Sequence, residues 1–311
     1  MKNQKLWMLA SLALLTACTK SENVTSVKPV TPQPNTTNSV SVLEFSPAPG
    51  QFVNDAPHWE AGMTEAQVLK NAQDALDNNT YVSLGGFGGY ITLGLKYPIP
   101  NNADGYSFLI KGNALNQWSE AGIILVSVDA NNNGKADDEW YEIAGSEYNS
   151  AKTIHNYQIT YYKPDENKVK TPNNNYNFLN DTTYIRWKDN QGKAGYLSRN
   201  TFHSQPYYPG WKGDSITFTG TRLTSDNVVD KSGVGQNFIS PAFDFGYVDN
   251  WPNDDERGKI KISWAVDKNG KSVNLKQINF IKVYTGMRAE AGWLGEISTE
   301  VTGFTDLTLK Q

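Results

Sequence analysis

Short runs of aromatic, aliphatic and β-branched residues recur along most of the chain, and Gly, Asn, Asp or Pro turns separate them. Runs of this composition and length are typical of β-strands. We expect strands at 81–84, 90–95, 107–110, 122–128, 140–144, 157–162, 184–188, 215–221, 259–266 and 277–284. No internal repeat of fixed period is visible, which disfavours a propeller or a solenoid. The pattern therefore predicts an all-β fold, a jelly-roll-like β-sandwich.

One segment near the start of this region has helical periodicity instead. Thr64 and Gln67 have the spacing of a capping box, in which each side chain caps a backbone N–H at the start of a helix. The apolar residues that follow at helical spacing are Val68, Leu69, Ala72, Ala75 and Leu76. Asn78 and Asn79 then stop the pattern. The sequence predicts one short N-terminal helix.

Four glycines surround Phe87 in the segment 85–89. The segment lacks the spacing and the Lys-Ser/Thr ending of a phosphate-binding loop. Because glycine permits positive φ angles and close approach of backbones, we predict a tight hairpin between the strands 81–84 and 90–95.

The first 17 residues predict a secretory signal peptide, with Lys2 and Lys5 before a twelve-residue apolar run. This run is shorter than the about 20 residues of a membrane span. Residues 15–18 resemble the lipobox of bacterial lipoproteins, which implies that Cys18 carries the lipid anchor. An ordinary leader with an incidental Cys18 is the alternative.

Residues 18–42 are rich in Ser, Thr, Asn and Pro and predict a flexible tether that begins at the lipidated Cys18. Residues 43–311 predict one β-sandwich domain that binds a ligand. A hydrophobic content of 38% with 12% aromatic residues is enough for a folded core. Thr19 replaces the Asp associated with inner-membrane retention in familiar lipoproteins. We therefore expect an exported protein, anchored only by its lipid to the outer membrane, at the cell surface.

The charge of the chain disfavours nucleic acid as a partner. Its formal net charge is −4, and loss of Lys2 and Lys5 with the leader leaves 26 basic against 32 acidic residues, or −6. Nucleic-acid binding depends on cationic contacts to phosphates, and no basic run is present. The single cysteine excludes an intramolecular disulfide and a cysteine-based zinc site.

Asp129 begins a twelve-residue loop that ends at Trp140 and has the spacing of a calcium loop over its first nine positions. The predicted calcium ligands are the side chains of Asp129, Asn131, Asn133 and Asp137 and the backbone carbonyl of Lys135. Trp140 stands where an EF-hand has Glu, and strands rather than helices are expected on both sides. A structural Ca²⁺ and an ordinary Asn/Gly hairpin are therefore both open interpretations.

A second acidic segment, 244–256, interleaves carboxylates with aromatic rings. Aromatic rings stack on sugars and carboxylates accept hydrogen bonds from hydroxyl groups, so this segment suits a polyol. A solvated loop with a Trp packed beneath it is the alternative interpretation.

Nothing in the sequence indicates a catalytic centre. The three histidines, His58, His155 and His203, show no metal-ligand spacing, and no Gly-x-Ser-x-Gly motif is present. Paired carboxylates could hydrolyse glycosides, but the sequence gives no distance between them. We therefore expect a protein that is not an enzyme and needs no organic cofactor.

Seven stretches of the chain have a distinctive sequence: PAPGQFVN (47–54), SLGGFGGYITLG (83–94), SVDANNNGKADDEWYEIAGSEY (127–148), IHNYQITYYKPD (154–165), DTTYIRWKDNQGKAGY (181–196), FHSQPYYPGW (202–211) and FIKVYTG (280–286). Together they resemble a family of Bacteroidota cell-surface lipoproteins that occur beside outer-membrane cobalamin-uptake components. The resemblance spans nearly all of 43–309 and implies capture of a corrinoid at the cell surface. The acidic loop with the following Trp-containing segment also resembles galactose-binding-like jelly rolls, many of which hold a structural calcium.

We thus expect a surface lipoprotein that binds a small nutrient, a corrinoid (cobalamin) first, and passes it to outer-membrane transporter components. The candidate ligand-binding aromatic residues are Tyr207, Tyr208, Trp211, Tyr247 and Trp251. The first alternative is a calcium-dependent carbohydrate-binding module that uses the same aromatic residues with Asp254 and Asp255. The second alternative is a surface glycoside hydrolase.

Overall fold

The computed structural model describes residues 39–102 and 105–309, and it confirms an all-β sandwich with one α-helix, α1 (Glu65–Asp77). The strands are β1 (Val40–Ser46), β2 (Val82–Ser83), β3 (Tyr90–Pro100), β4 (Phe108–Lys111), β5 (Gly122–Ser127), β6 (Trp140–Ile143), β7 (Ile154–Tyr162), β8 (Leu179–Asp189), β9 (Ala194–Asn200), β10 (Ser215–Arg222), β11 (Val229–Asp230), β12 (Phe238–Ile239), β13 (Ala265–Val266), β14 (Gln277–Thr285), β15 (Glu300–Val301) and β16 (Gly303–Asp306). Three 3₁₀ helices complete the fold: η1 (Glu256–Gly258), η2 (Ile262–Trp264) and η3 (Gly292–Leu294).

The predicted signal peptide, Cys18 and most of the predicted tether lie outside the described residues. Strand β1 begins at Val40, within the range assigned to the tether, and pairs with β3. Among the described residues, no helix has the length and apolar character needed to cross a membrane.

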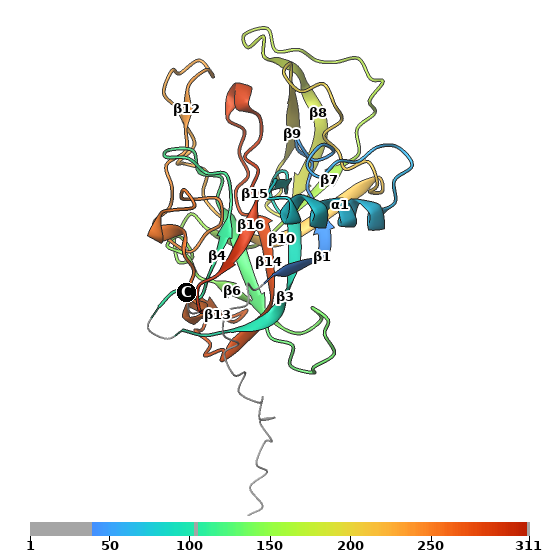
Figure 1. The fold of residues 1–311 in the computed structure, drawn as a ribbon. Coiled ribbons are helices and arrows are strands. Elements are labelled where there is room, and N and C mark those ends of the chain that lie inside the picture. Colours follow the sequence, from blue (N-terminus) through green and yellow to red (C-terminus); the bar gives the residue numbers. More distant parts are fainter. Residues whose placement is uncertain (1–38, 103–104, 310–311) are drawn as a thin grey trace, which may run out of the picture. The chain divides into compact units, whose positions relative to one another are not determined.

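Helix α1 begins and ends where the sequence predicts. The Thr64 hydroxyl accepts a hydrogen bond from Gln67 N at 3.3 Å, and Gln67 Oε1 accepts one from Thr64 N at 2.8 Å, which is the predicted capping box. Asn78 caps the carboxyl end, and Asn79 follows with a φ of 54°. The helix buries Val68 and its other inward-facing apolar residues against the core beside β1 (Figure 1).

The larger sheet has six antiparallel strands in the order β1-β3-β14-β5-β6-β13. Strand β14 lies in the middle and pairs with β3 and β5, so that Ile281 is opposite both Leu93 and Val126. Side chains alternate across this sheet. Ile124 and Val126 face the core that α1 covers, whereas Ile123 faces a second core.

A second sheet of four antiparallel strands, in the order β10-β7-β8-β9, covers that second core (Figure 1). Ile123 of the first sheet packs there in one cluster with Tyr157 and Ile159 of β7 and Phe218 of β10. Both faces of the six-stranded sheet are therefore buried along its middle. A ligand site must lie at the ends of the strands or beyond the edge of the second sheet.

The predicted strand 259–266 is wrong for most of its length. The segment forms η2 and only a two-residue strand, β13, next to β6. Its apolar residues Ile260 and Ile262 are fully buried, and Ile260 makes an isolated bridge with Phe108. Alternate apolar residues of this segment are therefore buried, although the segment does not form a continuous strand.

The predicted hairpin around the glycine-rich segment is also wrong. Strand β2 pairs with β15, and β3 pairs with β1 and β14, so 85–89 connects two different sheets. Within it, Gly89 N donates to Gly86 O at 3.3 Å, and Gly88 N donates to Thr285 O at 3.0 Å. The predicted close approach of backbones is present, because a Cβ on Gly89 would overlap the Leu84 carbonyl oxygen and the Ala48 nitrogen.

This crowding gives a test of the fold. Gly89→Ala should lower the free energy of unfolding in urea by about 1–3 kcal/mol or more, because backbone atoms must move to admit a methyl group. Gly213→Ala is the matched control, since nothing lies within 4 Å of a Cβ at that position. Equal stability of the two variants would contradict the described path of this segment.

Candidate functional site

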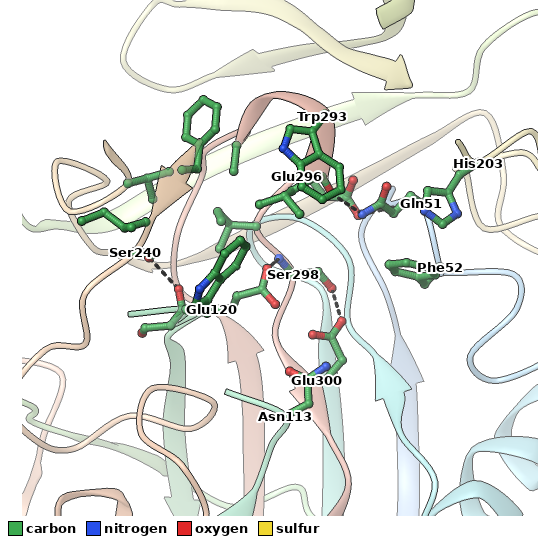
Figure 2. Close-up of a pocket in the computed structure, with 18 of the residues that line it drawn as sticks. Gln51, Phe52, Asn113, Glu120, His203, Ser240, Trp293, Glu296, Ser298 and Glu300 are labelled. Atoms are coloured by element: carbon green, nitrogen blue, oxygen red, sulfur yellow. Dashed lines mark hydrogen bonds between the residues drawn. The ribbon is translucent and has the colours of Figure 1, made fainter. Parts of the chain in front are cut away.

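A cavity of about 370 Å³ lies at the end of the sheet where β5 and β15 begin (Figure 2). Aromatic rings form much of its wall. Trp118, Phe202 and Trp293 keep 42%, 63% and 40% of their surface exposed, so their rings are open to a ligand. Phe202 packs edge-on against Trp293, with ring centroids 6.1 Å apart. Exposed aromatic rings around a cavity of this size are typical of small-molecule sites.

Carboxyl groups form the deep part of the cavity. Glu120, Glu296 and Glu300 line it, and the buried Asp249 lies behind them. The nearest oxygens of Glu120, Asp249 and Glu300 all lie within 4.8 Å of one another. We call these three residues the carboxyl cluster.

Asp249 fixes the position of the cluster through backbone contacts. Its Oδ1 accepts hydrogen bonds from Asn113 N and Ala114 N, both at 2.7 Å, and its Oδ2 accepts one from Glu300 N at 2.9 Å. Its own carbonyl oxygen accepts from Glu120 N at 2.8 Å. The Asp249 side chain thus joins the segment after β4 to the start of β15, and its backbone carbonyl adds the segment before β5.

Ser298 links the other two acids (Figure 2). Its backbone N–H donates to Glu120 Oε1 at 3.2 Å, and its hydroxyl donates to Glu300 Oε1 at 2.9 Å. The carboxyl oxygens of Glu120 and Glu300 lie within 4.8 Å of each other, so a charge on Glu300 raises the pKa of Glu120. Strand pairing holds Glu300 in place, because it lies opposite Ser83 of β2.

Burial disfavours the charged form of these acids. It raises the pKa of Asp249 to about 8 and that of Glu300 to about 6, and it raises the pKa of Glu120 well above its usual range. No lysine or arginine is among the described residues that line the cavity. No cation in this described lining favours their charged forms, so Asp249 is largely protonated near pH 7, whereas Glu300, with its lower pKa, is largely ionised.

Glu296 is a further acid in the wall of the cavity. Its Oε1 accepts a hydrogen bond from Gln51 N at 2.7 Å, whereas its Oε2 is buried and has no partner among the described residues. Burial raises its pKa to about 8, so it is mostly a neutral acid at pH 7. The carboxyl cluster and Glu296 together offer a ligand both hydrogen-bond donors and acceptors.

The aromatic residues proposed from the sequence lie elsewhere. Tyr207, Tyr208 and Tyr247 are buried in the second core, and their hydroxyl groups contact backbone atoms of Asn200, Gly213 and Glu147. These three side chains leave no surface for a macrocycle, because the packing of the sandwich uses both faces of their rings.

The other proposed ligand residues are at the surface or at the edge of the first core. Trp211 packs between Phe45 and Trp59, with ring centroids about 6 Å from each. The guanidinium of Arg257 lies 3.3 Å from the ring centroid of Trp251.

The two acids of this set, Asp254 and Asp255, belong to the same surface loop as Trp251. Asp255 accepts from Arg257 N and caps η1, and Asp254 is exposed. None of the seven proposed ligand residues lines the cavity.

The acidic loop is held by hydrogen bonds among its own residues, and the amide nitrogen of Asn133, not its oxygen, faces Asp137. Asp129 accepts hydrogen bonds from Asn133 N at 3.0 Å and Gly134 N at 2.9 Å, and the Asn133 amide donates to Asp137 Oδ2 at 3.1 Å. Asn131 Oδ1 also accepts from Asn133 N, at 2.9 Å. The loop joins β5 to β6, which pair antiparallel.

The donor set of this loop fits a hard cation. The side chains of Asp129, Asn131, Asn133 and Asp137 offer oxygens only, which calcium prefers. Such an ion would hold the carboxylates together and fix the loop. The carboxyl cluster is less suited to a metal, because both oxygens of Asp249 already accept backbone N–H groups.

A scan against protein-family models finds no match for this chain, and a search of curated proteins finds none.

The buried acids predict a pH dependence of stability. Because their folded pKa values exceed the ordinary 3.8 and 4.5, the folded state holds protons that the unfolded chain has released. The protonated acids therefore contribute fully to the free energy of unfolding below about pH 4, and this contribution is lost as the pH rises to about 8. We expect the free energy of unfolding in urea to be at least about 2 kcal/mol lower at pH 8 than at pH 5.

Glu120→Gln should reduce this difference, because an amide cannot lose the proton that burial retains. Glu60→Gln, at an exposed position, is the matched control and should leave the difference unchanged. A wild-type stability that rises between pH 5 and pH 8 would contradict the protonation that we assign to these acids.

Proposed function

We propose that this protein is a surface lipoprotein that captures a corrinoid, and that one edge of the corrinoid enters the cavity above the carboxyl cluster. The main support for this proposal is that one cavity combines acids that have no lysine or arginine beside them with the exposed rings of Trp118, Phe202 and Trp293. The resemblance to lipoproteins beside cobalamin-uptake components supplies the identity of the ligand.

The chemistry of the cavity favours a ligand rich in N–H or O–H donors. Carboxyl oxygens at its base accept hydrogen bonds, and no described lysine or arginine is present to bind an anion. A corrinoid carries carboxamide side chains around a broad apolar ring system. Its amides would bind Glu120 and Glu300 while its ring edge covers the indoles of Trp118 and Trp293.

The size of the cavity limits how the ligand binds. A corrinoid is much larger than 370 Å³, so only part of it can enter, and the rest must lie over the rim. The exposed rings of Trp118, Phe202 and Trp293 are at that rim. A partly enclosed ligand also suits transfer to an outer-membrane transporter, which must reach it.

We propose binding rather than catalysis for this site. Ser298 donates hydrogen bonds to Glu120 Oε1 and Glu300 Oε1, and these contacts fix both acids as part of a binding surface. A general acid and base must exchange protons with a substrate, and the roles proposed for Glu120 and Glu300 need no such exchange. Export, lipid attachment at Cys18 and an outer-membrane location belong to the same proposal and rest on the leader pattern.

Calorimetric titration of the full-length protein in detergent with cyanocobalamin tests this proposal. Wild type should give saturable heat, and Trp118→Ala or Trp293→Ala should weaken binding at least about tenfold, a loss of about 1.4 kcal/mol. Trp251→Ala is the control, because this Trp lies in a surface loop outside the cavity.

Three outcomes would overturn the proposal. Absence of heat with wild type would exclude a corrinoid as the ligand. Loss of cyanocobalamin affinity in Trp251→Ala alone would show that the ligand binds the loop 244–256 and not the cavity. Conversion of the ligand, seen by chromatography after incubation, would replace binding by turnover.

We further propose that the acidic loop holds a structural calcium ion. Added Ca²⁺ should raise the melting temperature of the protein, because an ion that binds only the folded state stabilises it by mass action. Asp129→Ala should abolish the rise. Asp254→Ala, an exposed acid outside this loop, should retain it. A rise that survives Asp129→Ala would contradict the assignment.

A further inference from the structure

A second cavity, of about 690 Å³, lies between the edge strand β10 and the six-stranded sheet. Trp140 and Glu142 of β6 and Lys282 of β14 line one side, and Thr219 and Thr221 of β10 line the other. It shares no lining residue with the cavity above the carboxyl cluster. It is therefore a separate place where a ligand could bind.

A hydrogen-bonded chain crosses the base of this second cavity. Glu142 Oε2 lies 2.6 Å from the Thr221 hydroxyl, and His155 Nδ1 lies 3.2 Å from the same hydroxyl. His155 Nε2 lies 3.1 Å from the Tyr148 carbonyl oxygen. A carbonyl only accepts, so Nε2 carries a proton and the orientation of the imidazole is fixed.

The other oxygen of Glu142 is available to a ligand. Glu142 lines the cavity, and no described residue hydrogen-bonds its Oε1. Burial raises its pKa to about 7, so that it can donate or accept a hydrogen bond near neutral pH. Glu142 is half-buried, so this oxygen faces the cavity from a partly exposed side chain.

The charges and rings of the cavity limit the class of ligand. Acidic Glu142 and Asp267 are balanced by basic Lys268 and Lys282, so the lining favours neither an anion nor a cation. The Nζ of Lys282 lies 5.1 Å from the ring centroid of the half-buried Trp140, and the rest of this indole offers an apolar surface. Most of the remaining lining residues are Thr, Asn, Gly or aromatic.

We infer that this second cavity binds a neutral carbohydrate. Sugar hydroxyls both donate and accept hydrogen bonds, as the Glu142, Thr and Asn groups require, and the apolar face of a pyranose packs on an indole such as Trp140. The site is independent of corrinoid capture and uses none of the aromatic residues or acids of the surface loop 244–256.

Saturation-transfer NMR and calorimetry with maltotriose and cellotriose test the inference on the full-length protein. At least one trisaccharide should bind saturably to wild type. Trp140→Ala should weaken it at least tenfold, and Glu142→Gln should weaken it severalfold. Trp140→Phe, which retains a ring, should keep affinity within a few-fold and shows whether the alanine variant has merely misfolded.

The two sites are separated by a reciprocal control. Trp118→Ala should leave trisaccharide affinity unchanged, and Trp140→Ala should leave cyanocobalamin affinity unchanged. Absence of binding by both trisaccharides, or binding that survives Trp140→Ala and Glu142→Gln together, would overturn the inference without bearing on corrinoid capture.

Discussion

The buried carboxyl group of Asp249 is the contact on which the first cavity depends. Three backbone N–H groups, from Asn113, Ala114 and Glu300, donate to it from two segments distant in sequence. Asp249 itself has a φ of 52°, an uncommon conformation for a residue other than glycine. Loss of this carboxyl group would leave two buried N–H groups and one partly buried N–H group without partners, which is costly. These hydrogen bonds favour retention of the uncommon backbone conformation.

The location of both cavities follows from the way the sheets pack. The six-stranded sheet has apolar residues on both faces, with Ile124 and Val126 toward one core and Ile123 toward the other. Most of its middle is therefore closed to a ligand, and the exception is the part of β14 near Lys282 that lines the second cavity. Space remains where loops enter β5 and β15, and where β10 forms the edge of the smaller sheet. The first location is lined by buried acids and the second by balanced charges, so the two would select different ligands.

The sequence was informative where local interactions decide structure. The capping box at Thr64 and Gln67 specifies where α1 begins, and strand-like composition located most of the long strands. The segment 259–266 failed because buried Ile260 and Ile262 mimic strand alternation without forming a ladder. The hairpin at 85–89 failed because sequence order does not determine which strands pair.

The carboxyl cluster could not be predicted in this way. Glu120, Asp249 and Glu300 come from three distant parts of the chain, and each resembles an ordinary surface acid in its own segment. The available signal was weak: Glu120 directly precedes the apolar run 121–126, where a charged residue is at the border of the core. Residue type likewise cannot separate the buried Tyr207 and Tyr247 from the exposed Trp118, because burial depends on tertiary packing.

The energetic cost of these buried acids is itself an argument for function. Glutamine or serine could make comparable hydrogen bonds at Glu120 and Glu300 without the penalty of an ionisable group, and stability alone would favour them. Protonation lowers the penalty, since the raised pKa values keep the acids partly neutral near pH 7. A protonated carboxyl group offers a ligand an O–H donor and an acceptor oxygen. A carboxylate only accepts hydrogen bonds, and an amide donates through N–H groups instead. Local departures from the most stable choice are expected at sites selected for binding.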